Sequence, residues 1–269
     1  MYLTYFGFKE APFSLTPDPR FLFFARHHRE AYDHHIYGIE NRKGFIELTG
    51  EVGSGKTTIC RTVLSGLSAN VNTALVLNPR LTETQLLKAI LSDFTVPVSG
   101  RSRLAYIECL NAFLLNQLRL GNNVALIIDE AQDLSEVVLE QVRLLSNLET
   151  DQHKLIQIVL CGQPELRHRL ALPSLRQLRQ RIMVRYHLFP LTEHETKHYI
   201  QFRLKKAGLQ ENELFSLDAM RRVYRYSNGI PRLINAVCDI ALLAGYAAGT
   251  KRIDSNCIKK AIRQLEGRV

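Results

Sequence analysis

The chain has 269 residues, 46% of them hydrophobic and 23% charged, a globular composition sufficient for one large domain or two small ones. Its five cysteines are scattered, odd in number and lack a C-x-x-C pair, which argues against a disulfide framework or a cysteine zinc site and indicates a reducing compartment. The N-terminus lacks the pattern of a signal peptide, and Asp239 interrupts the most apolar late stretch, 236–248, so we expect a cytoplasmic protein without a membrane span.

The net charge of +9 is unevenly distributed along the chain. Residues 1–163 carry 15 basic and 17 acidic side chains, whereas residues 164–269 carry 20 basic and 9 acidic ones. A basic C-terminal third is typical of a surface that faces DNA or anionic lipid, and equally of a solvated basic face that supplies cations to a nucleotide. Basic and aromatic residues do not alternate here, so the sequence leaves both interpretations open.

The first 28 residues are rich in aromatic residues and prolines, which disfavour a long helix and favour an extended segment. So many rings require a packing surface, which predicts an arm laid over the core, and such an arm can also form a wall of an adenine pocket. Residues 29–41 are predicted to form a helix. Residues 1–44 are therefore expected to be an N-terminal arm and helix that contribute to the adenine pocket.

A phosphate-binding loop follows the first predicted strand, 45–49. Residues 50–57 fit the P-loop pattern G-x-x-x-x-G-K-[ST], and residues 58–67 have the apolar spacing of a helix, which together argue against a chance glycine-rich turn. In this pattern Lys56 reaches the β- and γ-phosphates of ATP, and the hydroxyl of Thr57 binds Mg²⁺. The predicted nucleotide-binding residues are Gly50, Gly53, Ser54, Gly55, Lys56, Thr57 and Thr58.

An acidic pair follows the third predicted strand. Between it and the P-loop we predict a strand at 73–77 and helices at 82–93, with Thr82 as N-cap, and at 102–120. Asp129 and Glu130 then follow the apolar run 124–128, at the carboxyl end of a strand, where ligands bind in open α/β sheets. We predict that Asp129 holds Mg²⁺ and that Glu130 polarises the attacking water as general base. The alternative, a pair that only caps the next helix, is weakened by the P-loop upstream.

A polar amide is expected at the same edge of the sheet. A helix is predicted at 135–148, and the buried strand 155–161 then ends in Gly162-Gln163. The amide of Gln163 can orient water or contact the γ-phosphate there, and a plain turn residue is the alternative. A last strand is predicted at 184–188. The arginines of the segment before it are Arg167, Arg169, Arg176, Arg179 and Arg181.

Strands alternate with helices from residue 45 to residue 188, which specifies a parallel sheet with helices on both faces. Beyond Leu191 the pattern is helical throughout. We therefore predict an α/β core at 45–190 and a small, separate all-helical domain at 191–269. The helices expected in that domain are 192–207, 216–226, 230–247 and 254–265.

One motif is expected to be misleading. His194 to His198 match H-E-x-x-H, the zinc-binding pattern of a metalloprotease helix. Thr192 and Glu195 equally form a capping box at a helix start, and no third ligand is suggested nearby. We therefore expect a structural helix start and no zinc.

Together these motifs resemble the AAA+ ATPases of the general secretion pathway protein A type, including relatives linked to mannose-sensitive haemagglutinin pilus biogenesis. The resemblance covers nearly the whole chain, and its N-terminal stretch is the most specific part. The matching segments are 5–8, 12–22, 28–31, 37–39, 44–58, 128–132, 162–166, 180–182 and 229–235.

The resemblance implies a P-loop NTPase core of the AAA+ type with sheet order 5-1-4-3-2 and a helical lid. It implies Mg²⁺-dependent hydrolysis of ATP to ADP and phosphate in a nucleotide-dependent homo-oligomeric ring. It also implies a sensor at Gln163, a lid sensor at Arg232 and a trans-acting arginine finger at Arg181, with Arg176 and Arg179 as alternatives.

Two tasks follow from the resemblance. The first is to assemble or energise a type II secretion or pilus system, with its assembly proteins as partners and with the ATPase cytoplasmic and peripheral at the inner membrane. The second is a DNA-associated ATPase of the transposition target-selector type, which the basic C-terminal third would serve. A non-hydrolysing scaffold is a third class, against which Glu130 argues. Secretion-type members continue into a transmembrane segment and a peptidoglycan-binding domain that this sequence lacks, so we expect a shorter pilus-type relative or an excised cytoplasmic domain.

Overall fold

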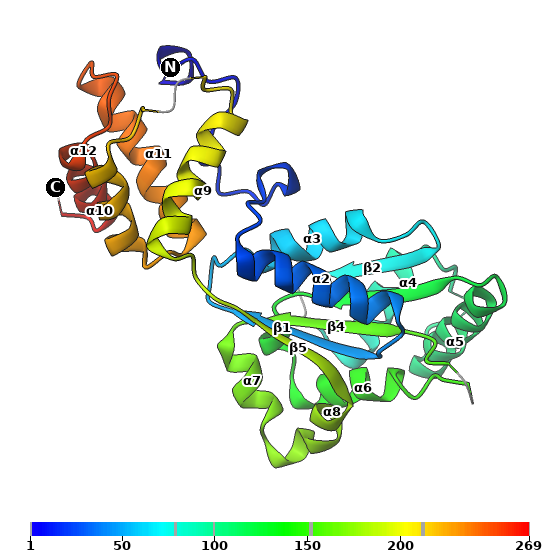
Figure 1. Cartoon of the computed structure of the whole chain (residues 1–269). Coiled ribbons are helices and arrows are strands. Elements are labelled where there is room, and N and C mark those ends of the chain that lie inside the picture. Colours follow the sequence, from blue (N-terminus) through cyan, green and yellow to red (C-terminus); the bar gives the residue numbers. More distant parts are fainter. Residues whose placement is uncertain (1, 78–79, 99, 151–152, 211–212, 269) are drawn as a thin grey trace. The chain divides into compact units, whose positions relative to one another are not determined.

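The protein is described from a computed structural model (Figure 1), and the described residues are 2–77, 80–98, 100–150, 153–210 and 213–268. The strands are β1 Phe45–Gly50, β2 Val71–Val76, β3 Asn123–Ile128, β4 Gln157–Gly162 and β5 Ile182–Leu188. The α-helices are α1 Tyr2–Phe6, α2 Arg26–Glu40, α3 Lys56–Gly66, α4 Glu83–Asp93, α5 Arg103–Arg119, α6 Glu136–Leu145, α7 Pro164–Leu170, α8 Arg176–Arg181, α9 Glu193–Lys206, α10 Leu217–Ser227, α11 Pro231–Ala247 and α12 Ser255–Leu265. Short 3-10 turns are η1 Pro19–Phe21, η2 Ala131–Asp133 and η3 Pro173–Leu175.

The chain forms two compact units. The sheet unit consists of residues 29–50 and 59–188, and the helical unit consists of residues 1–28, 51–58 and 189–269. The predicted division at residues 44 and 190 was drawn from sequence alone, and it stays a prediction. None of the helices in the described part of the chain is long and apolar enough to cross a membrane.

The five strands of the sheet unit form one parallel sheet in the order β2-β3-β4-β1-β5. Counted from the other edge, this is the predicted order 5-1-4-3-2, so the predicted topology is confirmed. The register pairs Thr49 with Gly162 and Ile128 with Leu160, so β1, β4 and β3 end along the same edge. The chain leaves β1 at Gly50 to form the P-loop, which begins at this carboxyl edge.

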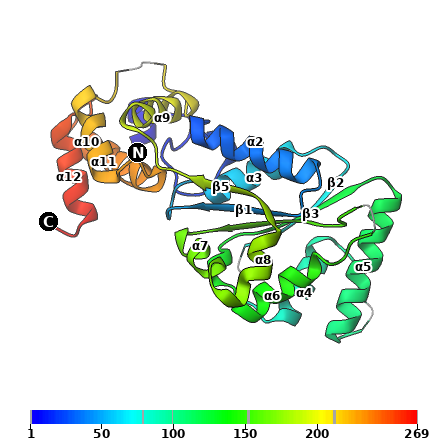
Figure 2. The ribbon, with the colours of Figure 1, turned by 60° about the horizontal axis from the view of Figure 1, so that its bottom comes forward.

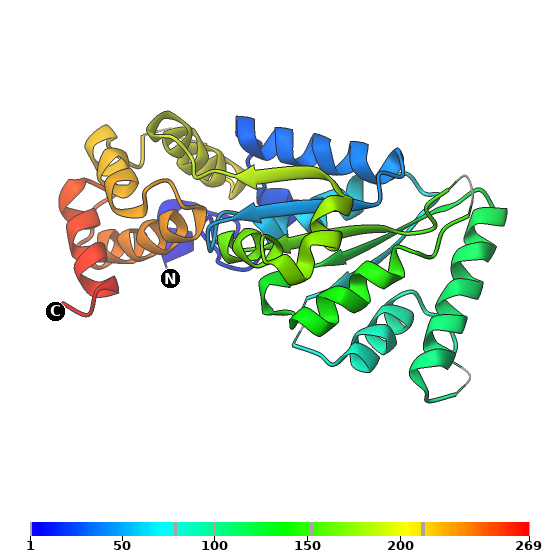
Figure 3. The same cartoon turned by 90° about the horizontal axis from the view of Figure 1, so that it is seen from below.

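Helices cover both faces of the sheet. Val124, Leu126 and Ile128, on one side of the interior strand β3, belong to a buried cluster with apolar residues of α4 to α8. Helices α2 and α3 lie over the opposite face (Figure 3), where the Sγ atoms of Cys60 in α3 and Cys161 in β4 are 2.9 Å apart. Burial on both faces explains why the central strands are uninterrupted apolar runs.

Side chains cap the helices where the sequence predicted helix starts. Thr82 Oγ1 accepts a hydrogen bond from the backbone of Gln85, whose side chain accepts one from the backbone of Thr82. The same reciprocal motif begins α9, where Glu195 Oε2 accepts hydrogen bonds from the backbone N (2.9 Å) and the hydroxyl (3.0 Å) of Thr192. The capping box predicted inside the H-E-x-x-H match is therefore confirmed.

The helical unit combines α9 to α12 with the N-terminal arm (Figure 2). Phe6, Phe13 and Phe21 of the arm are buried in one cluster with apolar residues of these helices. Arg203 of α9 is 6% exposed, donates hydrogen bonds to the carbonyls of Pro12 and Ser14, and lies 4.8 Å from the ring centre of Phe21. The arm thus finds its packing surface on the C-terminal helices, a partner that its aromatic composition did not identify.

The buried histidine of α2 makes stability depend on pH. His35 is 1% exposed, its Nδ1–H donates to the carbonyl of Ala31, and its Nε2 has no partner among the described residues. Burial lowers the pKa of His35 to about 4, well below the value of 6.5 of an exposed histidine. Between pH 6.5 and 4 the imidazole of His35 therefore binds a proton in the unfolded protein but not in the folded one. The contribution of neutral His35 to the free energy of unfolding is fully present above this pH range and is lost as the pH falls through it.

We expect His35→Phe to remove part of this acid sensitivity. The pKa difference corresponds to a loss of about 2 kcal/mol in the free energy of unfolding of the wild type on going from pH 7.5 to pH 5. Urea denaturation at the two pH values measures this loss, which should be smaller by about this amount in the variant. His34→Phe, at the neighbouring exposed histidine, is the control and should behave like the wild type. Equal losses in His35→Phe and the wild type would contradict the assignment.

Candidate active site

The backbone of the P-loop has the curl that phosphate binding requires. Gly53 and Gly55 have φ angles of +79° and +105°, which other residues rarely adopt. Helix α3 begins at Lys56, so the first-turn N–H groups and the positive end of the helix dipole lie at the loop. The side chain of Lys56 is buried, and its Nζ donates to the carbonyl of Glu51 at 3.0 Å. Thr57 and Thr58 lie in the first turn of α3.

A histidine outside the motif supports the P-loop. His28, in the first turn of α2, is 3% exposed, and its Nε2 lies 3.1 Å from the carbonyl oxygen of Ser54. Burial lowers the pKa of His28, so the ring is neutral at pH 7 and donates Nε2–H to this carbonyl. His28 Nδ1 and Ser54 Oγ are both buried and have no hydrogen-bond partner within the described ranges. Buried polar atoms normally have partners, so two unpaired ones at a phosphate loop fit the binding of a polar ligand.

The predicted lid sensor Arg232 lies against the P-loop. It is the second residue of α11, and its backbone N–H donates to the carbonyl of Gly53 at 3.2 Å. A Cβ atom placed on Gly53 would be 2.4 Å from the Cβ of Arg232, so only glycine permits this approach. The contact shown is through the backbone of Arg232, whereas its side chain is exposed.

Asp129 and Glu130 extend from β3 at the carboxyl edge of the sheet. Asp129 is 2% exposed, and its backbone N–H donates to the carbonyl of Val76 in β2 at 2.9 Å. Glu130 has φ 52° and ψ 38°, in the left-handed region, where a residue other than glycine is strained by about 1 kcal/mol or more. Strained backbone that is held by its surroundings is characteristic of functional sites.

Gln163 meets Glu130 across the ends of two adjacent strands. Gln163 follows β4, and its Nε2 lies 3.3 Å from Glu130 Oε2. The expectation that these two side chains share one sheet edge is therefore confirmed by the distance between them. A third side chain, Gln132, donates to the same carboxylate oxygen at 2.7 Å. No role was predicted for Gln132 from the sequence, because its side chain reaches this site only through the register of β3 against β4.

Arg181 lies at the opposite end of the sheet. It is the last residue of α8 and directly precedes β5, whose seven residues span about 20 Å. Its Nη1 donates to Ser146 Oγ, at the end of α6, at 2.6 Å. The side chains of Arg176 and Arg179 are exposed. The amino end of β5 is thus remote from Glu130 in the same chain.

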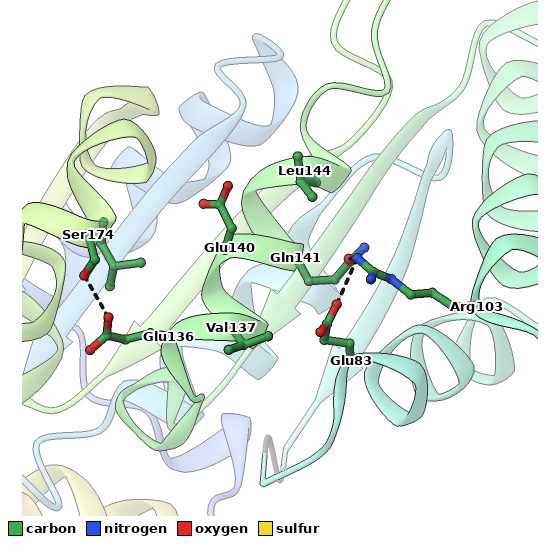
Figure 4. Close-up of a pocket in the computed structure, with 9 residues that line it drawn as sticks. Glu83, Arg103, Glu136, Val137, Glu140, Gln141, Leu144 and Ser174 are labelled. Atoms are coloured by element: carbon green, nitrogen blue, oxygen red, sulfur yellow. Dashed lines mark hydrogen bonds and ion pairs between the residues drawn. The ribbon is translucent and has the colours of Figure 1, made fainter.

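A separate cavity of about 450 Å³ opens on the sheet unit beside α6 (Figure 4). Its lining includes the carboxylates Glu83, Glu136 and Glu140 and the guanidinium of Arg103. Arg103 forms an ion pair with Glu83 at 2.9 Å, and Ser174 Oγ donates to Glu136 at 2.7 Å. The excess of carboxylates repels polyphosphate, so this cavity does not suit a nucleotide.

Comparison with known proteins adds independent evidence. The family model described as an AAA domain matches residues 39–170. General secretion pathway protein A of Aeromonas hydrophila is 45% identical over 268 residues, which cover 99% of this chain and 49% of that protein. The chain thus spans about half the length of the curated relative it matches.

Two solved structures share the fold at low sequence identity. The ORC2 protein of Aeropyrum pernix, in ADPNP–ADP complexes, has a TM-score of 0.70 and 19% identity, with 95% of this chain and 72% of that chain covered. The ORC1 protein of the same organism, in complex with DNA, has a TM-score of 0.68 and 18% identity, with 96% and 70% covered. With its sheet order, P-loop and acidic pair, the chain has the fold of the AAA+ P-loop ATPases and is similar to general secretion pathway protein A along nearly its whole length.

Proposed function

We propose that the chain binds and hydrolyses ATP. The P-loop binds the phosphates through backbone N–H groups and Lys56. Asp129 and the hydroxyl of Thr57 would hold Mg²⁺, which would supply positive charge to the phosphates. Glu130 takes a proton from the water that attacks the γ-phosphorus, ADP leaves, and Gln163 orients the water. The observation that supports this most strongly is the Glu130–Gln163 pair on the sheet edge at which the P-loop begins.

We propose further that activity belongs to a homo-oligomer. Arg181 supplies positive charge to the γ-phosphate of a neighbouring subunit, because its own strand places it at the wrong end of the sheet for its own Glu130. Arg232 senses the bound nucleotide and couples it to movement of the lid in its own chain. Its backbone contact with Gly53 supports this, because a change in the loop moves the start of α11.

The favoured task is assembly or energising of a secretion or pilus system at the inner membrane. The supporting observation is 45% identity to a protein named for the general secretion pathway. The second candidate is a DNA-associated ATPase. Exposed basic side chains on α10 and α12 support it, and they include Arg221, Arg225, Lys259, Lys260 and Arg263.

Glu130→Gln tests the proposed chemistry. The amide keeps the size of the side chain but cannot accept the proton, so we expect ATP to bind with wild-type affinity while hydrolysis falls by about 10²- to 10⁴-fold. Steady-state phosphate release and titration with a fluorescent ATP analogue measure the two quantities. Wild-type hydrolysis by this variant would show that another residue activates the water.

The same variant, loaded with ATP, separates the two tasks. Binding to duplex DNA that weakens steeply with salt would favour the DNA-associated role. Recruitment to inner-membrane vesicles carrying secretion or pilus assembly proteins, without salt-sensitive DNA binding, would favour the first role.

A further inference from the structure

The carboxamide of Gln132 lies between the proposed base and the proposed sensor. Its Nε2 donates to Glu130 Oε2 at 2.7 Å, and its Oε1 accepts from the backbone N–H of Gln163 at 2.9 Å. The acceptor bond fixes the orientation of the amide, because only the oxygen can face an N–H group. The donor end must then face Glu130. Gln132 therefore connects the residues that follow β3 to the end of β4.

The surroundings of Gln132 leave room for its amide and hold its backbone. A Cβ placed on Gly162 would lie 2.8 Å from Gln132 Oε1, so the glycine at the end of β4 makes room for this amide. Arg169 of α7 donates a hydrogen bond to the carbonyl of Gln132 and holds the turn that carries it. Gln132 is itself half-buried. Its side chain is held by the hydrogen bonds at the two ends of the amide, to Glu130 and from Gln163.

The arrangement leaves one oxygen of the base available. Within the part of the chain that the structure describes, Gln132 and Gln163 both donate to Oε2 of Glu130, and no hydrogen bond reaches Oε1. The two amides therefore fix how the carboxylate is turned. Oε1 is the oxygen that can accept a proton from water.

We propose that Gln132 is a positioning residue for ATP hydrolysis. It holds the Glu130 carboxylate in the orientation that activates water, and it links this carboxylate to the end of β4, which Gln163 follows. This rests on the proposed role of Glu130 as general base. Gln132 needs no contact with the nucleotide and acts through Glu130. Because Glu130 has a left-handed backbone, its side chain cannot rely on regular strand geometry for its orientation.

The alternative is that Gln132 only stabilises the turn after β3. The two roles differ in what they change. A structural role lowers the melting temperature or nucleotide affinity and does so whether or not Glu130 is present. A positioning role lowers kcat at unchanged affinity, and its effect disappears once the carboxylate is gone.

The test is a double-mutant cycle of Gln132→Ala with Glu130→Gln, measured by single-turnover hydrolysis, analogue binding and thermal unfolding. We expect Gln132→Ala alone to lower kcat by about 100-fold, the scale of a misplaced catalytic group, with analogue affinity within about twofold of wild type. In the Glu130→Gln background the same change should add nothing to the loss. Gln132→Glu, which has the same shape but no donor, should lower kcat at least as much and remains informative if the alanine variant unfolds.

Gln117→Ala is a matched control. Gln117 also bridges two groups, since its Oε1 accepts hydrogen bonds from Asn72 (2.8 Å) and Asn122 (2.7 Å), but it lies on α5 near the amino ends of β2 and β3. It should leave kcat unchanged. An unchanged kcat in Gln132→Glu, or an equal loss with and without the Glu130 carboxylate, would overturn the proposal. A fully active Glu130→Gln variant would instead refute the general base, which keeps the two failures distinct.

Discussion

Replacing Arg181 with alanine is expected to lower the ATPase rate of the assembled protein by about 10³-fold or more, the contribution of an arginine supplied in trans. The reason is geometric. Arg181 precedes β5, and Glu130 follows β3, so in one chain they stand at opposite ends of the parallel sheet. The guanidinium of Arg181 can therefore reach a γ-phosphate only in a head-to-tail assembly, in which the amino end of β5 in one subunit faces the nucleotide of the next subunit.

Mixing two inactive variants measures this directly. Arg181→Ala keeps Glu130, and Glu130→Gln keeps Arg181. In a one-to-one mixed ring, about a quarter of the interfaces pair an intact Glu130 with an intact neighbouring Arg181. We therefore expect phosphate release to recover to about a quarter of the wild-type rate, from a nearly inactive level for each variant alone.

The neighbouring arginines supply the controls. Arg176→Ala and Arg179→Ala remove exposed arginines from the same helix and should retain most of the activity. If one of them instead shows the loss and the recovery on mixing, that residue and not Arg181 is the finger. A specific activity that is independent of protein concentration, with no recovery on mixing, would exclude a trans-acting arginine altogether.

Lys56→Ala is expected to weaken ATP binding by at least about 100-fold, because charge-assisted hydrogen bonds to two phosphates are lost. The variant also loses the hydrogen bond from Nζ to the carbonyl of Glu51, so thermal unfolding is measured alongside binding of a fluorescent ATP analogue. Lys88→Ala, at an exposed lysine on α4, controls for the loss of a positive charge. Unchanged analogue affinity in Lys56→Ala would refute the assignment of this loop.

The sequence predicted most of the sheet unit because its signals are local. The apolar runs ending at Ile128 and Cys161 predicted buried parallel strands, and Thr82 and Thr192 predicted helix starts through their own hydrogen-bonding capacity. The motifs likewise placed Glu130 and Gln163 at strand ends. Their meeting depended only on the parallel topology, which the alternation of strands and helices specified.

What the sequence did not predict depends on contacts between distant segments. Gln132 bridges to Gln163 only because β3 and β4 are neighbours in one register, and nothing in the residues around Gln132 encodes that bridge. The contact between the ring of His28 and the carbonyl oxygen of Ser54 was missed for the same reason, because His28 lies far from the P-loop pattern in the sequence. The packing surface of the aromatic arm was also missed, because composition indicates that rings are buried but not on which surface.

The position of the N-terminal arm has a consequence for synthesis. The arm is made first, yet its partners are made last: the hydroxyl of Tyr2 donates to Asp239 Oδ1 at 2.5 Å, 237 residues away. At ribosomal rates of about 5–20 residues per second, roughly 10–50 s pass between the synthesis of Phe6, Phe13 and Phe21 and the synthesis of α11. Throughout that interval the nascent chain exposes an aromatic segment whose packing surface in the folded protein has not yet been made, so we expect this segment to be a binding site for chaperones during synthesis.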